Sequence, residues 1–170
     1  MTQLEEFRTE KNTVFASDPQ SPLTPAQKKT FIGLNYYSEN PALRFEKKIN
    51  KAANRETIKM QTSTGSMQNF KKLGKVNFSV EGQEAELTIY LGDHGDYFMP
   101  FKDASSGSET YGAGRYLEPI PLGGDLFLID FNYAYNPYCA YNDGWTCPLP
   151  PAENRLKVPI KAGEKTFEAH

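Results

Sequence analysis

A hairpin signal near the middle of the chain constrains the fold most strongly. The segments Lys75–Val80 (KVNFSV) and Glu84–Leu91 (EAELTIYL) alternate between apolar and polar residues, and Glu81-Gly82-Gln83 separates them. Alternation with a period of two is typical of strands that are buried on one face, and a short connection containing glycine favours a tight hairpin. This part of the chain is therefore expected to form antiparallel sheet.

Strand-like segments continue on both sides of this hairpin. They are predicted at Ala42–Ile49, Thr57–Thr62, Tyr97–Lys102, Arg115–Ile120, Asp125–Tyr133 and Leu156–Lys161. Strands of this length and spacing are typical of an antiparallel β-barrel or sandwich, here with about eight or nine strands. We expect one domain, in which residues 35–170 form the β-structure and residues 1–34 form a helical segment that packs on it.

Two helices are predicted in the helical segment. Thr2–Ser17 carries a stripe of apolar residues, and its charged residues, Lys11 among them, fall mostly outside that stripe; the stripe consists of Leu4, Phe7, Val14 and Phe15. Thr24 followed by Pro25 is typical of a helix N-cap and first turn. A short helix is therefore predicted over about Pro25–Phe31.

Charge and hydropathy narrow the class of protein. The net charge of −2 provides no excess of basic residues, which a nucleic-acid-binding protein would need. The first ten residues have no basic start and no apolar core of a secretory signal, and no apolar run approaches the ~18 residues of a membrane span. We therefore expect a cytoplasmic protein with reduced thiols, whose partners include neither nucleic acid nor membrane.

The segment Asp125–Tyr133 places polar groups on an otherwise apolar strand. One face carries Phe127, Ile129, Phe131 and Tyr133, and the other carries Leu126, Leu128, Asp130 and Asn132. Asp130 and Asn132 continue the line of the two leucines, so they are expected to point into the same interior, ~6–7 Å apart along the strand.

A buried carboxylate at Asp130 needs a cation or several donors. Arg115 is the natural partner for Asp130 or for Asp103, because its guanidinium can hold a carboxylate with two hydrogen bonds. Our hypothesis is that Arg115, Asp130 and Asn132 line one cavity. The alternative is a structural ion pair that fixes the register of two strands.

The loop Ser105–Gly114 (SSGSETYGAG) combines glycines with hydroxyl groups. Such a loop can turn its backbone N–H groups toward an anion, and this would give Ser106 and Tyr111 a role in ligand binding. The loop matches neither the phosphate-binding loop of nucleotide hydrolases nor the dinucleotide fingerprint. An ordinary glycine-rich connection between strands is the alternative.

Cys139 and Cys147 lie in a stiff loop that contains several prolines. Three interpretations are open: buried free thiols that only pack, a disulfide or redox pair, and a metal site. We expect no metal site, because the chain has no close cysteine pair and its histidines are His94, in a turn, and the terminal His170. Either cysteine is also a candidate nucleophile, and Glu153 is a candidate general base or an ordinary turn residue.

At these residues the chain resembles a known family. The motifs that carry the resemblance are, in order, Phe101-Lys102-Asp103-Ala104, Ser106-Gly107, Glu109-Thr110-Tyr111-Gly112, Gly114-Arg115-Tyr116-Leu117, Asp130-Phe131-Asn132, Tyr135-Asn136-Pro137, Cys139-Ala140-Tyr141, Cys147-Pro148-Leu149-Pro150-Pro151 and Glu153-Asn154. They resemble the bacterial and archaeal family called domain of unknown function sixteen-eighty-four. The resemblance covers most of the chain and implies that these polar residues belong to the family's motifs; it implies no activity.

The leading functional hypothesis is a pocket for a small polar or anionic ligand, with catalysis as an open question. The predicted ligand-binding residues are Asp103, Ser106, Tyr111, Arg115, Asp130, Asn132, Asn136, Tyr141 and Asn154. The candidate catalytic residues are Asp130, Cys139, Cys147 and Glu153. A flavin is a further hypothesis, by analogy with small split barrels. Two non-catalytic roles also fit the sequence: a protein-interaction module with exposed rings over Tyr133–Trp145, and a polar network that only braces the fold.

Overall fold

Two antiparallel sheets form the centre of the protein in this computed structural model, which describes residues 1–167. The smaller sheet has the strand order β1-β9-β8, with β1 at Arg44–Lys48, β8 at Ile120–Gly123 and β9 at Leu126–Asp130. The larger sheet has the order β2-β4-β5-β6-β7, and β3 also pairs with β4. Its strands are β2 (Asn50–Lys51), β3 (Thr57–Gln61), β4 (Met67–Val80), β5 (Gln83–Leu91), β6 (Tyr97–Phe101) and β7 (Arg115–Leu117).

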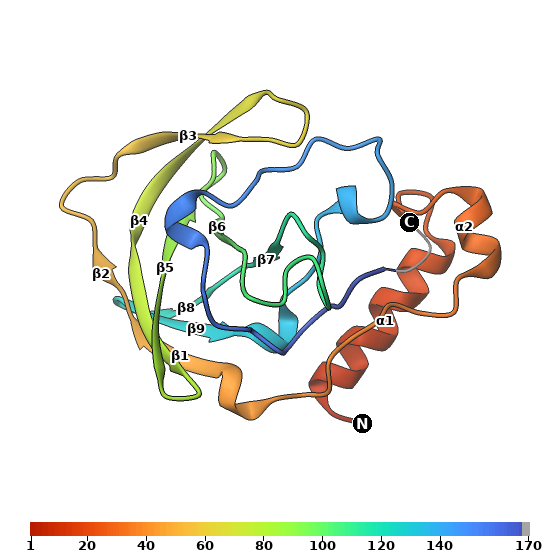
Figure 1. The fold of residues 1–170 in the computed structure, drawn as a ribbon, viewed down its shortest axis with the longest axis horizontal. Coiled ribbons are helices and arrows are strands. Elements are labelled where there is room, and N and C mark those ends of the chain that lie inside the picture. Colours follow the sequence, from red (N-terminus) through yellow and green to blue (C-terminus); the bar gives the residue numbers. More distant parts are fainter. Residues whose placement is uncertain (168–170) are drawn as a thin grey trace.

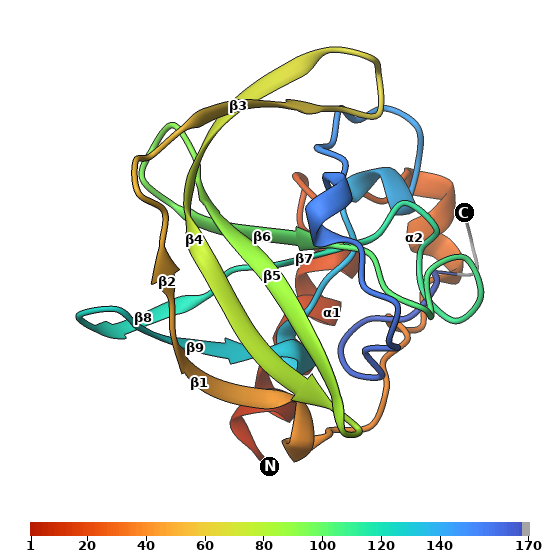
Figure 2. The same ribbon diagram turned by 60° about the vertical axis from the view of Figure 1, so that its left-hand side comes forward.

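The two sheets do not close into a barrel, so the sandwich is the correct one of the two predicted architectures (Figure 1). Strands β4 and β5 form the predicted hairpin, and its turn residue Glu81 has a φ of 50° next to Gly82 at 81°. Figure 2 shows this long hairpin on the near side of the molecule, with the β8–β9 hairpin extending to one side.

Aromatic rings fill much of the space between the sheets. Phe131 is fully buried, and the centroid of its ring lies 5.4 Å from those of Phe78 and Phe101 and 6.2 Å from that of Phe45. Phe127 and Ile129, on one face of β9, are also buried, whereas Leu126, Leu128 and Asp130 on the other face are only partly buried. The face of aromatic and aliphatic residues is therefore buried as expected, but the interior expected around Leu126, Leu128 and Asp130 is not fully enclosed.

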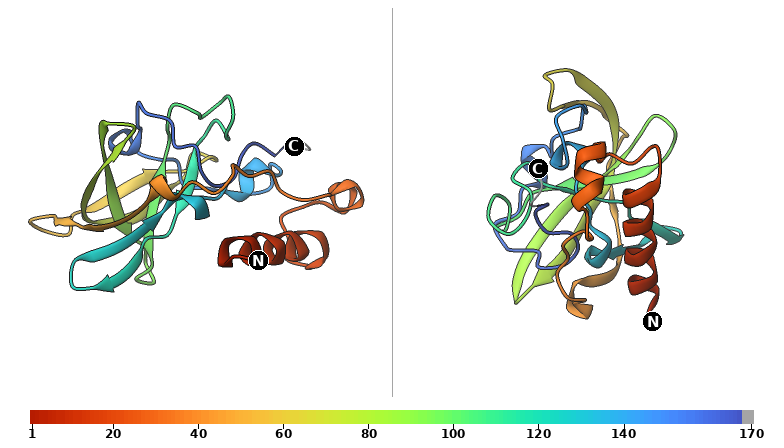
Figure 3. Two further views of the ribbon diagram at one scale, coloured as in Figure 1. Left: turned by 90° about the horizontal axis from the view of Figure 1, so that it is seen from below. Right: turned by 90° about the vertical axis from the view of Figure 1, so that its right-hand side faces the viewer.

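Both predicted helices are present at one side of the sheets (Figure 1). Helix α1 spans Gln3–Ser17 and begins with a capping box between Thr2 and Glu5; helix α2 spans Pro25–Thr30 and begins with the same motif at Thr24 and Gln27. Figure 3 shows α1 beside the sheets, separated from them by connecting segments. Among residues 1–167, no helix has the length and apolar character that a bilayer crossing needs.

Four strand predictions need correction. The segment predicted at Arg115–Ile120 is divided into β7, which ends at Leu117, and β8, which begins at Ile120. The segment Leu156–Lys161 is irregular, because its backbone groups bind the Arg115 and Asp103 side chains and the backbone of Lys102. The strand predicted at Asp125–Tyr133 ends at Asp130, where the 3-10 turn Phe131–Tyr133 begins. Strand β4 begins at Met67, eight residues before its predicted start at Lys75, and β3 pairs along this first part. His170 lies outside the described residues.

We predict that Phe131→Ala lowers the free energy of unfolding by ~3–5 kcal/mol, because it removes a ring that touches three other rings and leaves a cavity. Urea denaturation followed by circular dichroism measures this change. Ile32→Ala is the matched control: Ile32 is 100% exposed, so its truncation should cost less than ~0.5 kcal/mol. A loss below ~1 kcal/mol for Phe131→Ala would contradict the central place of this ring.

Candidate functional site

Arg115 is buried and binds protein atoms. Its side chain is 1% exposed, and its Nη2 donates to Asp103 Oδ2 and to the carbonyl of Ile160, each at 2.8 Å. Its Nη1 donates to the carbonyls of Ala162 and, at 3.2 Å, Glu164. Burial lowers the pKa of Arg115, and the carboxylate of Asp103 opposes that shift. The guanidinium therefore ties the segment 160–164 to β7 and has no surface to offer a ligand.

Two glycines allow this network to form. Gly114, directly before Arg115, has a φ of 104°, and a Cβ there would lie 2.6 Å from the carbonyl oxygen of Phe101. Gly163 has a φ of 81°, and a Cβ there would lie 2.7 Å from the carbonyl oxygen of Ala134. Both positions need the left-handed backbone and the close approach that only glycine permits without strain.

Asp130 and Asn132 belong to a different network. Because the strand ends at Asp130, its Oδ1 caps the following turn and accepts hydrogen bonds from the backbone and side-chain N–H groups of Asn132. Asn132 in turn binds both backbone groups of Asn40, and the Asp130 carboxylate lies 3.8 Å from Arg44 Nε. Among the described residues, no hydrogen bond joins Arg115 to either of these two side chains.

The glycine-rich loop directs its amides inward. The N–H groups of residues 106 to 110 all donate to backbone carbonyls between Asp103 and Thr110, and three of them share the carbonyl of Ser105. The hydroxyl of Ser106 accepts a hydrogen bond from the amide of Asp103. These amides are therefore occupied within the loop, which favours an ordinary connection over an anion cradle.

Asn154 completes the larger sheet. Its side chain is fully buried, and it donates to and accepts from the backbone of Thr88 on β5 while also donating to the carbonyl of Pro100 on β6. Proline has no N–H to contribute to a sheet. The amide of Asn154 thus supplies the pairing that Thr88 would otherwise lack, and this contact accounts for its burial without a ligand.

Glu153 accepts hydrogen bonds from the hydroxyl of Tyr90 and, at 3.2 Å, from Lys72. Burial raises the pKa of Glu153, but these two donors outweigh that effect and leave its pKa below the ordinary value. A carboxylate held in its ionised form by two donors is a weak base. This environment does not favour the general-base role that the sequence suggests.

Cys139 and Cys147 are free and buried, and both contact Ser63. Cys139 Sγ lies 3.3 Å from the hydroxyl of Ser63, which also accepts a hydrogen bond from the amide of Cys147. Burial, followed by a hydrogen bond with Cys139, raises the pKa of Cys147 to about 12. Tyr111 is half-buried near these thiols. Within residues 1–167, no three His, Cys, Asp or Glu side chains gather as metal ligands would.

A second buried ion pair connects α1 to the rest of the protein. Glu164 is 1% exposed, and its carboxylate pairs with Lys11 of α1. The same carboxylate accepts hydrogen bonds from the amide of Asn136 at 3.0 Å and from the hydroxyl of Tyr141 at 2.7 Å. Burial and then this carboxylate raise the pKa of Tyr141 well above its ordinary value, so Tyr141 remains a hydrogen-bond donor.

A largely apolar hollow of about 440 Å³ opens beside Lys11, between α1 and the segment Tyr135–Tyr138. We call it the α1 pocket; it is lined by Phe7, Glu10, Lys11, Val14, Phe15, Tyr135 and Tyr138. The ammonium of Lys11 lies 5.2 Å from the ring centroid of Tyr135 and 5.4 Å from that of Phe15. Largely apolar walls with a small number of polar groups, here Lys11 and Glu10, are typical of sites for small molecules.

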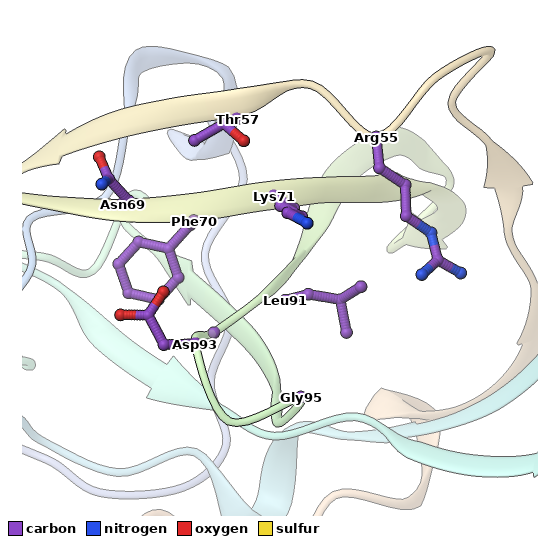
Figure 4. A pocket seen from close by; sticks show the side chains of 9 residues that line it. Arg55, Thr57, Asn69, Phe70, Lys71, Leu91, Asp93 and Gly95 are labelled. Carbon is purple, nitrogen blue, oxygen red and sulfur yellow. The ribbon is translucent and has the colours of Figure 1, made fainter.

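Another hollow, of about 320 Å³, lies between β3, β4 and the turn after β5 (Figure 4). Arg55, Lys71 and Asp93 all line it, and all three are exposed to solvent. Figure 4 shows Arg55 and Asp93 on opposite sides of this hollow. Because water screens such exposed charges, this hollow offers a ligand less than the apolar walls of the α1 pocket do.

Comparison with known proteins places the chain in a family. The profile of the family described as "Protein of unknown function (DUF1684)" matches residues 29–165. The chain belongs to this family. A solution NMR structure of the uncharacterised protein from gene locus rrnAC0354 of Haloarcula marismortui is 33% identical, with a TM-score of 0.75, and the match covers 99% of this chain and 95% of the archaeal one. Comparison with curated proteins finds no match.

The residues matched by the family include Asp103, Arg115 and Glu164, whereas Lys11 precedes them. Neither Lys11 nor Glu164 is among the site residues predicted from the sequence. One signal points to Lys11: it lies four residues after Phe7 and four before Phe15, so all three share one face of the helix. A lysine between two aromatic residues on one face of a helix needs a partner, and Glu164 is that partner here.

We predict that Asp103→Ala lowers the free energy of unfolding by ~3–5 kcal/mol, because it leaves the guanidinium of Arg115 buried without its counter-ion. Urea denaturation measures the loss. Lys75→Ala, which breaks an ion pair whose side chains are 46% and 51% exposed, should cost less than ~1 kcal/mol. Equal losses in the two variants would contradict the structural importance of the buried pair.

The raised pKa of Cys147 predicts a loss of stability at alkaline pH. In the unfolded chain a thiol ionises near pH ~8.5, whereas in the folded protein Cys147 stays neutral up to a pKa of about 12. The folded state therefore binds more protons above pH ~8.5, and the free energy of unfolding should fall there by on the order of 1 kcal/mol per pH unit. Cys147→Ala should have the shallower slope in urea denaturation between pH ~8.5 and ~10.5; identical slopes would contradict this assignment.

Proposed function

We propose that this protein binds a small amphipathic molecule in the α1 pocket, with an apolar body and a head group that accepts a hydrogen bond from Lys11. The observation that carries this proposal is the ammonium of Lys11 at the wall of a hollow whose other lining residues, apart from Glu10, are aromatic or aliphatic. Volumes of ~300–1,000 Å³ are usual for ligand pockets, and the volume of about 440 Å³ falls in that range.

The ammonium has hydrogen-bonding capacity for a ligand. It carries three N–H donors, and among the described residues the carboxylate of Glu164 is its hydrogen-bond partner. The Lys11 side chain is 17% exposed, so it is accessible from the pocket, whereas Glu164 and Tyr141 behind it are almost fully enclosed. Of Lys11, Glu164 and Tyr141, only Lys11 would therefore contact a ligand. A single contacting group from this polar cluster supports binding rather than catalysis.

The charges at the pocket favour an uncharged head group. Glu164 neutralises Lys11, and the carboxylate of Glu10 adds negative charge to the lining. A carbonyl or hydroxyl group accepts a hydrogen bond from Lys11 without repulsion from these two carboxylates. The anionic ligand that the sequence suggests would meet that repulsion, and Arg115, its predicted anchor, is enclosed by protein.

The shape of the surface favours an elongated body. A second hollow of about 390 Å³ shares Phe7 and Tyr135 with the α1 pocket and continues toward Pro119 and Pro121. An aliphatic chain that lies across Phe7 could fill parts of both hollows. Burying such a chain contributes ~0.8 kcal/mol per methylene group, which is the main source of affinity in this proposal.

The burial of most aromatic rings in the segment Tyr133–Trp145 does not favour a flat docking surface. Tyr141 is fully buried, Tyr133 and Tyr135 are partly buried, and only Tyr138 and Trp145 are more than one-third exposed, at 43% and 37%. Two such rings do not make a large apolar patch. A concave site is the better-supported use of these aromatic residues.

Titration with N-phenyl-1-naphthylamine, an uncharged dye whose fluorescence rises in apolar sites, tests the proposal. We expect saturable binding to the wild-type protein and a loss of at least ~10-fold in affinity in Val14→Glu, because the new carboxylate enters the apolar lining. Met67→Glu is the matched control, since Met67 is 57% exposed on β4 while Val14 is 43% exposed. The Met67→Glu variant should bind the dye with the affinity of the wild-type protein.

Competition by 1-decanol and by decanoate tests the head group. Decanol should displace the dye at a lower concentration than decanoate, because the alcohol is not repelled by Glu10 and Glu164. The absence of saturable dye binding, or equal affinity of Val14→Glu and Met67→Glu for the dye, would contradict ligand binding in the α1 pocket. Stronger competition by decanoate would contradict the uncharged head group.

A further inference from the structure

We propose that Cys139 and Cys147 form an intramolecular disulfide in response to hydrogen peroxide, and that Ser63 positions the reacting thiol. The proposal concerns a modification site and does not depend on the ligand proposed for the α1 pocket.

The geometry brings both cysteines to one hydroxyl group. Ser63 Oγ lies 3.3 Å from Cys139 Sγ, and it accepts a hydrogen bond of 3.0 Å from the backbone amide of Cys147. The backbone amide of Ser63 also donates to the carbonyl of Cys147 at 2.9 Å. Ser63, in the turn between β3 and β4, thus holds the two ends of the cysteine loop together.

The thiols also influence each other electrostatically. Cys139 is among the neighbours that raise the pKa of Cys147, after burial, as expected of two cysteines on either side of Ser63. The two cysteine residues are 8% and 7% exposed, which admits a molecule of the size of hydrogen peroxide more readily than a bulky disulfide such as oxidised glutathione. The chain has only these two cysteines, so an intramolecular bond can form in one way.

Cys139 is the thiol that reacts first. A thiolate there would accept a hydrogen bond from the hydroxyl of Ser63, and such charge-assisted bonds stabilise the anion. Cys147, whose pKa burial and the neighbouring Cys139 raise to about 12, stays protonated. Cys139 is therefore the nucleophile of the pair, and Cys147 is the neighbouring thiol that reacts second.

The chemistry balances in two steps. The sulfur of Cys139 attacks one oxygen of hydrogen peroxide, the O–O bond breaks, and the thiol proton leaves with the other oxygen as water; Cys139 becomes a sulfenic acid. The sulfur of Cys147 then attacks the sulfur of Cys139, the S–O bond breaks, and the hydroxyl group leaves as water with the proton of Cys147. Two thiols lose two electrons, and one peroxide is reduced to two waters.

A nearby tryptophan reports on the reaction. Cys139 Sγ donates to the carbonyl of Trp145 at 3.2 Å, and the Trp145 ring packs on Tyr138 with centroids 5.0 Å apart. Formation of the disulfide removes the Cys139 donor and must shift this contact. Because Trp145 is the only tryptophan, its fluorescence follows the loop alone.

Treatment of the folded protein with hydrogen peroxide, followed by intact-mass spectrometry and thiol titration, tests the proposal. We expect the wild-type protein to lose ~2 Da (two hydrogens), both free thiols and its original Trp145 fluorescence, and to regain all three with dithiothreitol. Cys147→Ser should instead gain ~16 Da as a sulfenic acid that dimedone traps at Cys139. Far-UV circular dichroism confirms that the protein stays folded during the reaction.

Ser63→Ala tests the positioning role, because it removes the hydroxyl and leaves both thiols. The disulfide should form several-fold more slowly in this variant, whereas Ser79→Ala, on the exposed side of β4, should react at the wild-type rate. Retention of both thiols in the folded wild-type protein, or oxygen addition without the loss of ~2 Da, would overturn the disulfide. Equal rates in the two serine variants would overturn the role of Ser63.

Discussion

The hydrogen bonds of the Arg115 guanidinium to the segment 160–164 hold the architecture of this protein together. Without regular strand structure, that segment cannot satisfy its carbonyls through a sheet, and burying them unpaired would be costly. The guanidinium supplies donors to the carbonyls of Ile160, Ala162 and Glu164, and Asp103 balances its charge. An arginine suits this position because its planar fork presents several donors in fixed directions.

The position of α1 follows from this anchor. Fixing the backbone of Glu164 fixes its carboxylate, which then accepts Lys11 together with Asn136 and Tyr141. Other contacts reinforce the helix, among them Arg8 with the carbonyl of Tyr37 and the Phe7–Tyr133 ring pair. Only Leu4 and Phe15 of the helix are buried, so apolar packing alone holds it weakly. The α1 pocket thus exists because a polar chain of contacts runs from β7 through the C-terminal segment to the helix.

Local patterns predict the local structure of this family member well. Thr24 begins the second helix as predicted, a helix is present over most of the predicted range Thr2–Ser17, and the aromatic and aliphatic face of β9 is buried. Predictions fail where distant contacts override local preference. Leu156–Lys161 has the composition of a strand, yet the backbone of Ile160 forms hydrogen bonds with the side chains of Arg115 and Asp103 instead of with a neighbouring strand. Asp130 ends β9 because its side chain caps the turn that follows. The partner of Lys11 lies 153 residues away, so no local pattern could reveal it.

Amide hydrogen exchange, followed by mass spectrometry, of wild-type protein and the Arg115→Lys variant tests this account most directly. Lysine keeps the positive charge but lacks the two planar NH2 groups of the guanidinium, so it cannot form hydrogen bonds with all three carbonyls and with Asp103 at once. We expect faster exchange in two separate regions, the segment 160–164 and α1 (Gln3–Ser17), while the β4–β5 hairpin keeps its protection. Faster exchange in the segment 160–164 with unchanged exchange in α1 would show that the helix does not depend on the Arg115 anchor, and would contradict the account.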